Sequence, residues 1–199
     1  MPRAFTDDER DHVRDRLRTA AAARVAQVGY RRTTVGELAR AAGISKGAFY
    51  RFYDSKEALF VEILQDAEAD QRRRLQHAAR LEGPPREVLH AVLGQLRSIV
   101  AEHPLIGVLA NPEESAALFR HLPPGFLKEA QADDDRWFAG LFGDLARRGV
   151  VDADRVPVLV ALPRLLFAVA QGRQWLGDDF DPTTRLLVDA LSGHLGAEP

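Results

Sequence analysis

Apolar residues recur every three or four positions along most of the chain, which is the spacing of amphipathic helices. Thr6 and Glu9 form a capping box, which predicts a first helix from there to about Val28. Glycine and proline separate the helices expected next, near residues 55–81, 86–102, 105–120 (with a break at Asn111-Pro112) and 124–148. The pattern predicts an all-α protein of about nine helices.

The last two predicted helices, 156–175 and 182–195, are apolar nearly all round. A helix that is hydrophobic on every side must be covered on every side. Because these helices end the chain, we expect a second subunit to cover them, which predicts a homodimer through the C-terminal helices. Pro163 is expected to remove one backbone hydrogen bond and to bend the first of them.

Residues 33–57 have the signals of two short helices joined by a tight turn. Thr34 and Glu37 form a capping box at the start of the first helix. Gly43 can adopt the positive φ that ends this helix, and Ser45 can cap the second one. This order predicts a helix-turn-helix, whose second helix lies in the major groove of DNA.

The second of these helices has two chemically different sides. One arc of its helical wheel holds two cations, a phenol and a glycine, namely Lys46, Arg51, Tyr50 and Gly47. The opposite arc holds Ala48, Phe49 and Phe52, which suit a small core. Lys56 falls in the first turn of the next helix, where a cation does not favour the helix dipole, so we expect it to reach a phosphate.

These residues carry a resemblance to a known family. The segments are Gly29-Tyr30, Thr33-Thr34-Val35, Leu38-Ala39, Ala42-Gly43-Ile44-Ser45-Lys46-Gly47, Phe49-Tyr50-Arg51-Phe52-Tyr53 and Ser55-Lys56-Glu57-Ala58-Leu59-Phe60. Together they resemble the TetR (tetracycline-repressor-like) family of bacterial regulators, over roughly the first third of the chain. Tyr53 departs from the pattern, because the family usually has Phe there, and its hydroxyl needs a partner or a place at the edge of the core.

The resemblance and the wheel together give the candidate contacts to double-stranded operator DNA: Thr34, Ser45, Lys46, Gly47, Ala48, Tyr50, Arg51 and Lys56. Ala48 stays open, because the wheel turns it toward the core while the family often contacts bases from that position. Arg31 and Arg32 lie in the loop before Thr34, near where backbone contacts are expected. Arg3 is interpreted as part of a frayed terminus.

Composition and charge agree with this interpretation. The 199 residues are 46% hydrophobic and 28% charged, which is ordinary for a globular protein, and none is cysteine. No apolar run is long enough to span a membrane and the N-terminus is unlike a signal peptide, so we expect a cytoplasmic protein. The net charge of −2 divides into +4 over residues 1–60 (12 basic, 8 acidic) and −6 over residues 61–199 (15 basic, 21 acidic). A basic end on an acidic body is typical of local phosphate binding.

We therefore expect a three-helix DNA-binding domain at 1–54 and a ligand-binding and dimerisation domain at 55–199. The resemblance implies a small-molecule pocket in the second domain, for a lipophilic or aromatic ligand. The candidates to line it are Phe119, Trp137, Phe138, Leu141, Phe167, Gln171 and Trp175, each of which could equally be ordinary core. His103, His121 and Arg164 are possible polar anchors.

No catalytic or metal-binding pattern is present. The six histidines never fall four residues apart, so there is no helical zinc pair, and no cofactor motif occurs. Asp133-Asp134-Asp135 point in three directions, and Arg72-Arg73-Arg74 are mixed with acids, so both runs are interpreted as solvated surface. The function we expect is a ligand-responsive repressor and not an enzyme. The alternative is a helical ligand-binding protein or enzyme with a degenerate DNA-binding head.

Overall fold

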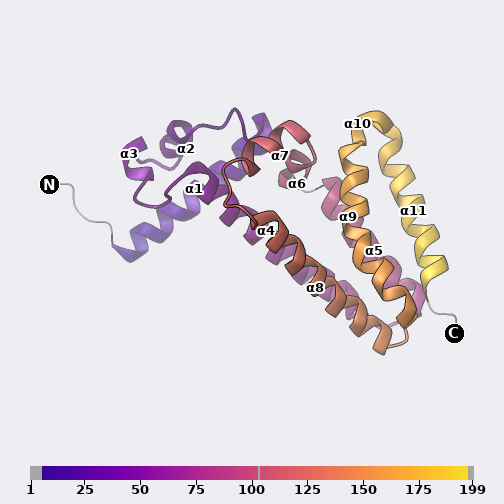
Figure 1. Ribbon diagram of the computed structural model, residues 1–199. Helices are drawn as coiled ribbons and strands as arrows, with labels where there is room; N and C mark the ends of the chain where they lie inside the picture. The colour runs from indigo at the N-terminus through magenta and orange to yellow at the C-terminus, as the bar shows by residue number, and fades with distance from the viewer. Residues whose placement is uncertain (1–5, 103, 197–199) are drawn as a thin grey trace.

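The computed structural model describes residues 6–102 and 104–196, and its regular structure is helical apart from one β-bridge between Val151 and Gly196 (Figure 1). The all-α prediction is confirmed. Arg3 and His103 lie outside the described residues. The N-terminal head contains α1 (Asp7–Val28), α2 (Val35–Ala41) and α3 (Lys46–Phe49).

A long helix, α4 (Lys56–Ala79), leads from the head into the body (Figure 1). In the body α4 packs against α5 (Pro85–Glu102) and α8 (Phe126–Arg147). The short helices α6 (Pro104–Leu109) and α7 (Pro112–Phe119) return to the head, where α6 packs on α1. The expected break at Asn111-Pro112 is confirmed, because the Asn111 side chain caps α7 by accepting the backbone N–H of Glu113 at 2.9 Å.

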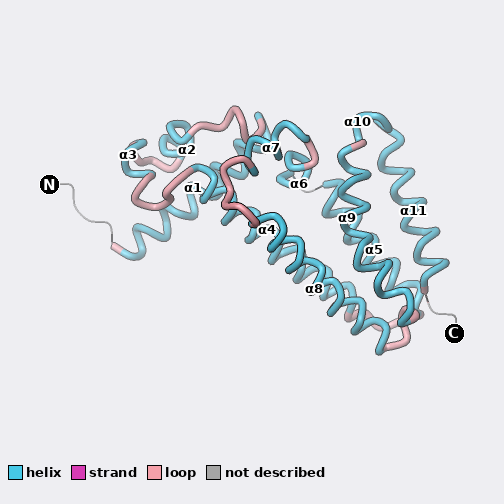
Figure 2. The backbone as a smooth tube through the Cα atoms, in the orientation of Figure 1, coloured by secondary structure: helices cyan, strands magenta, loops and turns pink. Residues whose placement is uncertain are grey.

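The C-terminal segment departs from the expected single helix over 156–175. It forms α9 (Val156–Gln171) and α10 (Arg173–Leu176), followed by α11 (Phe180–Leu195), with short 3-10 helices at Ala153–Arg155 and Gly177–Asp179. The break falls at Gly172, where the Trp175 ring packs so closely that an added Cβ would lie 3.2 Å from it. Pro163 lies inside α9, which continues through it. Figure 2 shows α9 and α11 as separate rods joined through α10.

The buried side chains form two main cores, and α4 contributes to both. The first core lies in the head, around Leu17, Leu38 and Phe49. Its members from further along the chain are Leu59, Phe60, Ile63, Leu105 and Leu118. The second core lies in the body, around Leu89 and Phe142, and includes Leu75 of α4. The first core therefore extends beyond residue 54, and the division into domains at that residue stays a prediction.

The exposed surface of α9 and α11 carries an apolar stripe. Val158 and Leu165 on α9 are 62% and 55% exposed, and Leu186 on α11 is 67% exposed.

Among the described residues, no helix is both long and apolar enough to cross a membrane.

Candidate nucleic-acid interface and ligand cavity

Side-chain caps and one glycine position the two short helices of the head. The Thr34 hydroxyl accepts the backbone N–H of Glu37 at 3.3 Å, and the Glu37 carboxylate accepts the N–H of Thr34 at 3.1 Å. Gly43 has a φ of 71°, which lets α2 end and the chain turn. The Ser45 hydroxyl then accepts the N–H of Ala48 at 3.1 Å. The caps predicted for both helices are confirmed.

The predicted separation of α3 and the turn after it into two sides is confirmed. Phe49 is fully buried and Phe52 is 6% exposed, so both belong to the first core. The candidate DNA contacts on the other side are exposed: Lys46, Gly47, Tyr50 and Arg51. Ala48 is half-buried between the two sides. The exposed side therefore presents two cations and a phenol to solvent, and its contact with DNA stays a prediction.

Lys56 has a position that sequence reasoning did not anticipate. Its ammonium donates to the backbone carbonyls of Tyr30 at 3.1 Å and Thr33 at 3.0 Å, and lies 3.9 Å from the centre of the Tyr30 ring. Burial lowers the pKa of Lys56. The side chain thus holds the loop between α1 and α2, and its expected contact with a phosphate stays a prediction. An ammonium has three donors, so one remains for a phosphate.

Tyr53 has the partner that its hydroxyl requires. The hydroxyl donates to Glu62 at 3.0 Å, and the same carboxylate accepts from the Arg18 guanidinium at 3.2 Å. Burial, and then the bond to Glu62, raise the pKa of Tyr53. Tyr30 makes the equivalent bond to Glu57, with the same effect on its pKa. Neither acidic partner was predicted, because tertiary packing brings the loop after α1 and the turn after α3 against α4.

Arg31 faces the body of the protein. Its backbone N–H donates to the Glu114 carboxylate at 2.9 Å, and its guanidinium pairs with Glu113. The Glu114 carboxylate lies against Gly29, where an added Cβ would be 2.8 Å away. The start of α7 is therefore joined to the loop that precedes the helix-turn-helix. The expected position of Arg31 near a DNA backbone is corrected to this contact, whereas Arg32 is exposed.

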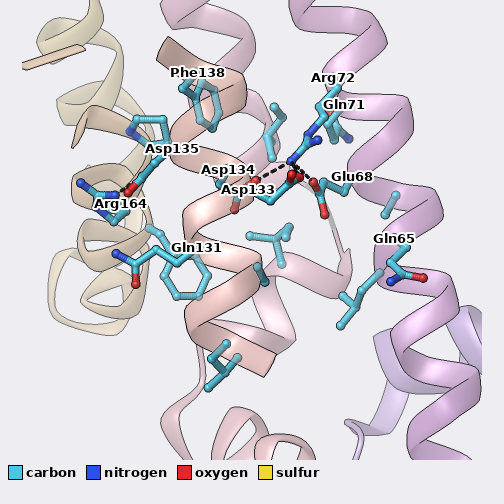
Figure 3. A pocket seen from close by; sticks show the side chains of 18 of the residues that line it. Gln65, Glu68, Gln71, Arg72, Gln131, Asp133, Asp134, Asp135, Phe138 and Arg164 are labelled. Carbon is cyan, nitrogen blue, oxygen red and sulfur yellow. Dashed lines mark hydrogen bonds and ion pairs between the residues drawn. The ribbon is translucent and has the colours of Figure 1, made fainter. Parts of the chain in front are cut away.

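The body encloses a cavity of about 900 Å³ between α4, α5, α6, α7, α8 and α9 (Figure 3). Three of the predicted lining residues are on its wall: Phe119, Phe138 and Phe167. Arg164 lines it too, whereas His121 is exposed and is not on its wall. Ligand binding by these side chains stays a prediction.

Four of the predicted lining residues lie elsewhere. Trp137 and Leu141 line a second hollow between the C-terminal halves of α4 and α8, because they point to another side of α8 than Phe138. Gln171 is exposed at the end of α9. Trp175 is 83% exposed, because the break at Gly172 turns it away from the line of α9.

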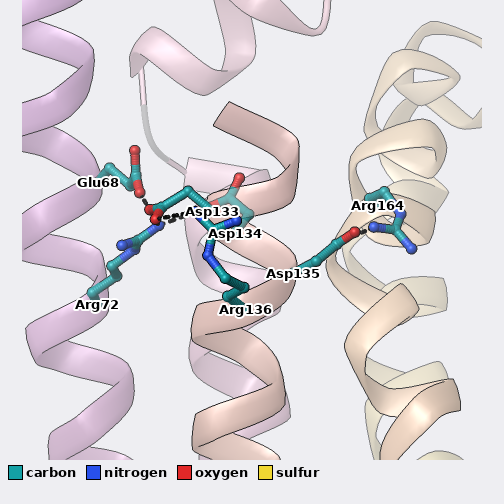
Figure 4. A network of polar contacts seen from close by, with 7 residues as sticks. All are labelled: Glu68, Arg72, Asp133, Asp134, Asp135, Arg136 and Arg164. Atoms are coloured by element: carbon teal, nitrogen blue, oxygen red, sulfur yellow. Dashed lines mark hydrogen bonds and ion pairs between the residues drawn. The ribbon is translucent and has the colours of Figure 1, made fainter. Parts of the chain in front are cut away.

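The cavity has a charged wall that corrects the expectation of solvated acidic and basic runs. The Arg72 guanidinium of α4 is bound by Glu68 on its own helix and by two carboxylates of α8, Asp133 at 2.9 Å and Asp134 at 3.0 Å (Figure 4). On the other side of α8, Asp135 pairs with Arg164 of α9. Adjacent acids point in different directions on a helix, and here arginines from the two neighbouring helices, α4 and α9, pair with them. No cluster suited to a metal ion occurs among the described residues.

Comparison with known proteins supports the helix-turn-helix. Residues 17–63 match the model of the family described as bacterial regulatory proteins, tetR family. The chain is 33% identical over 89 residues to the HTH-type transcriptional regulator AcrR of Shigella flexneri, covering 44% of this chain and 41% of that protein. It is 31% identical over 107 residues to the HTH-type transcriptional regulator YdgC of Bacillus subtilis, covering 50% and 55%. The matched region thus spans about half the length of these relatives or less.

Solved structures share the fold over nearly the whole chain. A TetR-family transcriptional regulator from Pectobacterium atrosepticum superposes with a TM-score of 0.71 at 21% identity, covering 98% of this chain and 100% of that one. RolR in complex with the ligand resorcinol superposes with a TM-score of 0.58 at 24% identity, covering 97% and 92%. Residues 17–63 thus match the TetR family of bacterial regulatory proteins, and over the whole chain the fold is similar to that of solved TetR-family regulators.

Proposed function

We propose that the protein is a homodimeric transcriptional regulator that binds double-stranded operator DNA through α3 and the turn after it. The observation that carries this proposal is the exposed side of α3, where Lys46, Tyr50 and Arg51 lie opposite the buried Phe49. Cations and a phenol on the surface of a second helix-turn-helix helix suit contacts to phosphates and base edges. The division of the chain into a DNA-binding part at 1–54 and a ligand-binding and dimerisation part at 55–199 belongs to the same proposal.

The proposed dimer uses the apolar stripe of α9 and α11. Val158, Leu165 and Leu186 are all more than half exposed, and they are the large apolar side chains that α9 and α11 turn to solvent. A partner stripe of the same kind would cover them by a two-fold interface. Two heads related in this way would read half-sites about 34–36 Å apart, so we expect a palindromic operator.

The proposed regulation is release of a repressor by a small molecule in the cytoplasm, where the DNA is. The cavity supports this, because the helices that line it include both α4, which leads into the head, and α7, which contacts Arg31. The RolR complex shows that one neighbour of this fold binds a small aromatic ligand, and a ligand of similar character is proposed here. A ligand acts only through its different affinities for the DNA-competent and incompetent forms, and a coupling of about 1–3 kcal/mol would weaken DNA binding roughly 5–150-fold.

Selection of bound sequences from a random duplex pool tests the proposal. We expect an enriched palindrome, whose binding weakens steeply with salt. Lys46→Ala should change the preferred base at one position of each half-site, by about 1–3 kcal/mol. Arg73→Ala is the matched control, because it removes one exposed cation from the body and not from the head. Recovery of no enriched sequence by folded wild-type protein would overturn the proposal.

A further inference from the structure

The wall of the cavity carries more negative than positive charge. Five carboxylates line it, from Glu68, Glu129, Asp133, Asp134 and Asp135. Three guanidiniums oppose them, from Arg72, Arg136 and Arg164, which leaves a net charge of −2. A ligand in this space therefore lies in a negative local potential.

Three of the five carboxylates lie together where α4 packs against α8. The guanidinium of Arg72 forms ion pairs with the three carboxylates of Glu68, Asp133 and Asp134 (Figures 3 and 4). Arg136 also pairs with Asp133, at 3.2 Å, although its side chain is 71% exposed. Burial and the neighbouring Asp134 and Asp133 raise the pKa of Glu68, against the opposing effect of Arg72. At this point of the wall two guanidiniums thus pair with three carboxylates, which leaves an excess of negative charge.

Apart from Glu129 and three glutamines (Gln65, Gln71 and Gln131), the lining of the cavity away from the charged residues is apolar. Its aromatic lining comes from Phe119 on α7, Phe126 and Phe138 on α8, and Phe167 on α9. Leu64 and Leu109 add aliphatic surface from α4 and α6. A site with aromatic walls and one charged side selects for molecules that are mostly apolar and carry a single compact charge.

We infer that the cavity takes a lipophilic monocation, whose charge lies beside Glu68 and Asp134 and whose apolar part lies among the phenylalanines. This inference rests on the proposed ligand-responsive function and names the class of its ligand. An anion is disfavoured, because it would displace carboxylates that already hold Arg72 and Arg164. A cation gains the attraction of the surplus negative charge and displaces no carboxylate from the wall.

The position of these carboxylates also lets a bound cation affect the head through α4. Arg72 and Glu68 belong to α4, and Asp133 and Asp134 belong to α8, so the ion pairs bridge these helices beside the cavity. A bound cation competes with Arg72 for the same carboxylates. The bridge between α4 and α8 is weakened as a result, and α4 is the helix that begins next to the helix-turn-helix.

Three probes of similar shape and different charge test the inference on the full-length protein without DNA. They are tetraphenylphosphonium, neutral triphenylphosphine oxide and tetraphenylborate, each titrated by calorimetry at low ionic strength. We expect the cation to bind about tenfold more tightly than the neutral probe, and the anion to bind least. Added salt should reduce the differences in affinity between the three probes, because the carboxylates of Glu68, Asp133 and Asp134 are partly exposed.

Charge-removing variants locate the site. Asp134→Asn and Glu68→Gln should each weaken binding of the phosphonium about tenfold and leave binding of the neutral oxide unchanged. Asp144→Asn is the matched control, because Asp144 also lies on α8 but lines the second hollow and not this cavity. Two separate variants are used so that misfolding of one, seen by circular dichroism, leaves the other as the test.

Equal affinity for the cation and the neutral probe would overturn the inference, as would tighter binding of the borate. Loss of phosphonium binding in Asp144→Asn to the same degree as in Asp134→Asn would also overturn it. Because no DNA is present in these titrations, a failure here is separate from a failure to select an operator, which concerns the proposed function itself.

Discussion

Lys56 stabilises the loop between α1 and α2 by donating to two of its backbone carbonyls. Its two carbonyl acceptors belong to Tyr30 and Thr33, both almost fully buried. A buried carbonyl left without a donor costs free energy. The proposed phosphate contact would use the third donor of the ammonium, so the proposal gives one residue both a structural and a DNA-binding role.

Lys56→Ala is expected to lower the free energy of unfolding by about 1–3 kcal/mol, because the Thr33 carbonyl loses this donor and the Tyr30 carbonyl keeps only the backbone N–H of Thr33. It should also reduce the salt dependence of DNA binding by roughly 0.9 in slope, through the lost phosphate contact. Urea denaturation and binding titrations over a range of salt measure the two effects. Lys46→Ala, on the exposed side of α3, is the control and should change stability by less than about 0.5 kcal/mol. Unaltered unfolding of Lys56→Ala would contradict the structural role.

The buried phenols of Tyr30 and Tyr53 make stability depend on alkaline pH. Burial and their bonds to Glu57 and Glu62 raise both pKa values above the ordinary value of 10.0. Above about pH 10 the unfolded chain releases protons that the folded chain retains, so stability is full below this pH and falls as pH rises. The expected loss is roughly 1.4 kcal/mol per pH unit for each phenol.

Tyr53→Phe should therefore flatten the decline in stability above pH 10, while Glu62 keeps its pair with Arg18. Denaturant unfolding at a series of pH values measures the slope in both proteins. A slope that is the same in the variant and the wild type would show that the Tyr53 hydroxyl does not titrate with folding.

At the scale of elements, local signals predicted helix ends well and tertiary orientation poorly. The caps predicted at Thr34 and Ser45 depend on side chains within three residues, and both are confirmed, as is the predicted break at Asn111-Pro112. Whether Trp137 or Phe138 faces the cavity depends on how α8 is rotated against α4 and α9, which helical periodicity in one sequence does not determine. The charged wall was missed for the same reason, because Arg72 meets acids 61 and 62 residues away.

The apolar stripe on α9 and α11 gives a prediction for the proposed dimer. Leu186→Glu should convert the dimer to a monomer, because a carboxylate in the centre of an apolar interface is costly to bury. Light scattering coupled to size exclusion at micromolar concentration measures the mass. Leu81→Glu is the control, since Leu81 is 43% exposed but lies outside these helices. A dimer that persists in Leu186→Glu, or that dissociates equally in Leu81→Glu, would place the interface elsewhere.

At the scale of the whole molecule, the head depends on residues far along the chain. The first core includes Leu105 of α6 and Leu118 of α7, which follow the entire length of α4 and α5. The same two short helices contribute Ile106, Leu109 and Phe119 to the cavity. One face of this segment therefore completes the core under the helix-turn-helix while another lines the proposed ligand site. A ligand that moves it would act on the head directly.

This shared packing can be measured with the chain's own chromophores. All three tyrosines (Tyr30, Tyr50 and Tyr53) lie in the head, and both tryptophans (Trp137 and Trp175) lie in the body. Tyrosine difference absorbance and tryptophan fluorescence therefore report unfolding of the two parts separately. In the wild type we expect the two transitions to coincide, because α4 and the α6–α7 segment join the cores.

Leu118→Ala should lower the tyrosine-reported transition, since truncating a buried leucine costs about 2–5 kcal/mol and Leu118 is 3% exposed in the first core. Leu145→Ala is the matched control, because Leu145 is equally buried but belongs to the second core, and it should act first on the tryptophan-reported transition. If Leu118→Ala left the tyrosine signal unchanged, the head would be stable without α7. A ligand could then reach the helix-turn-helix only through α4, and the contact between Glu114 and Arg31 would have no part in regulation.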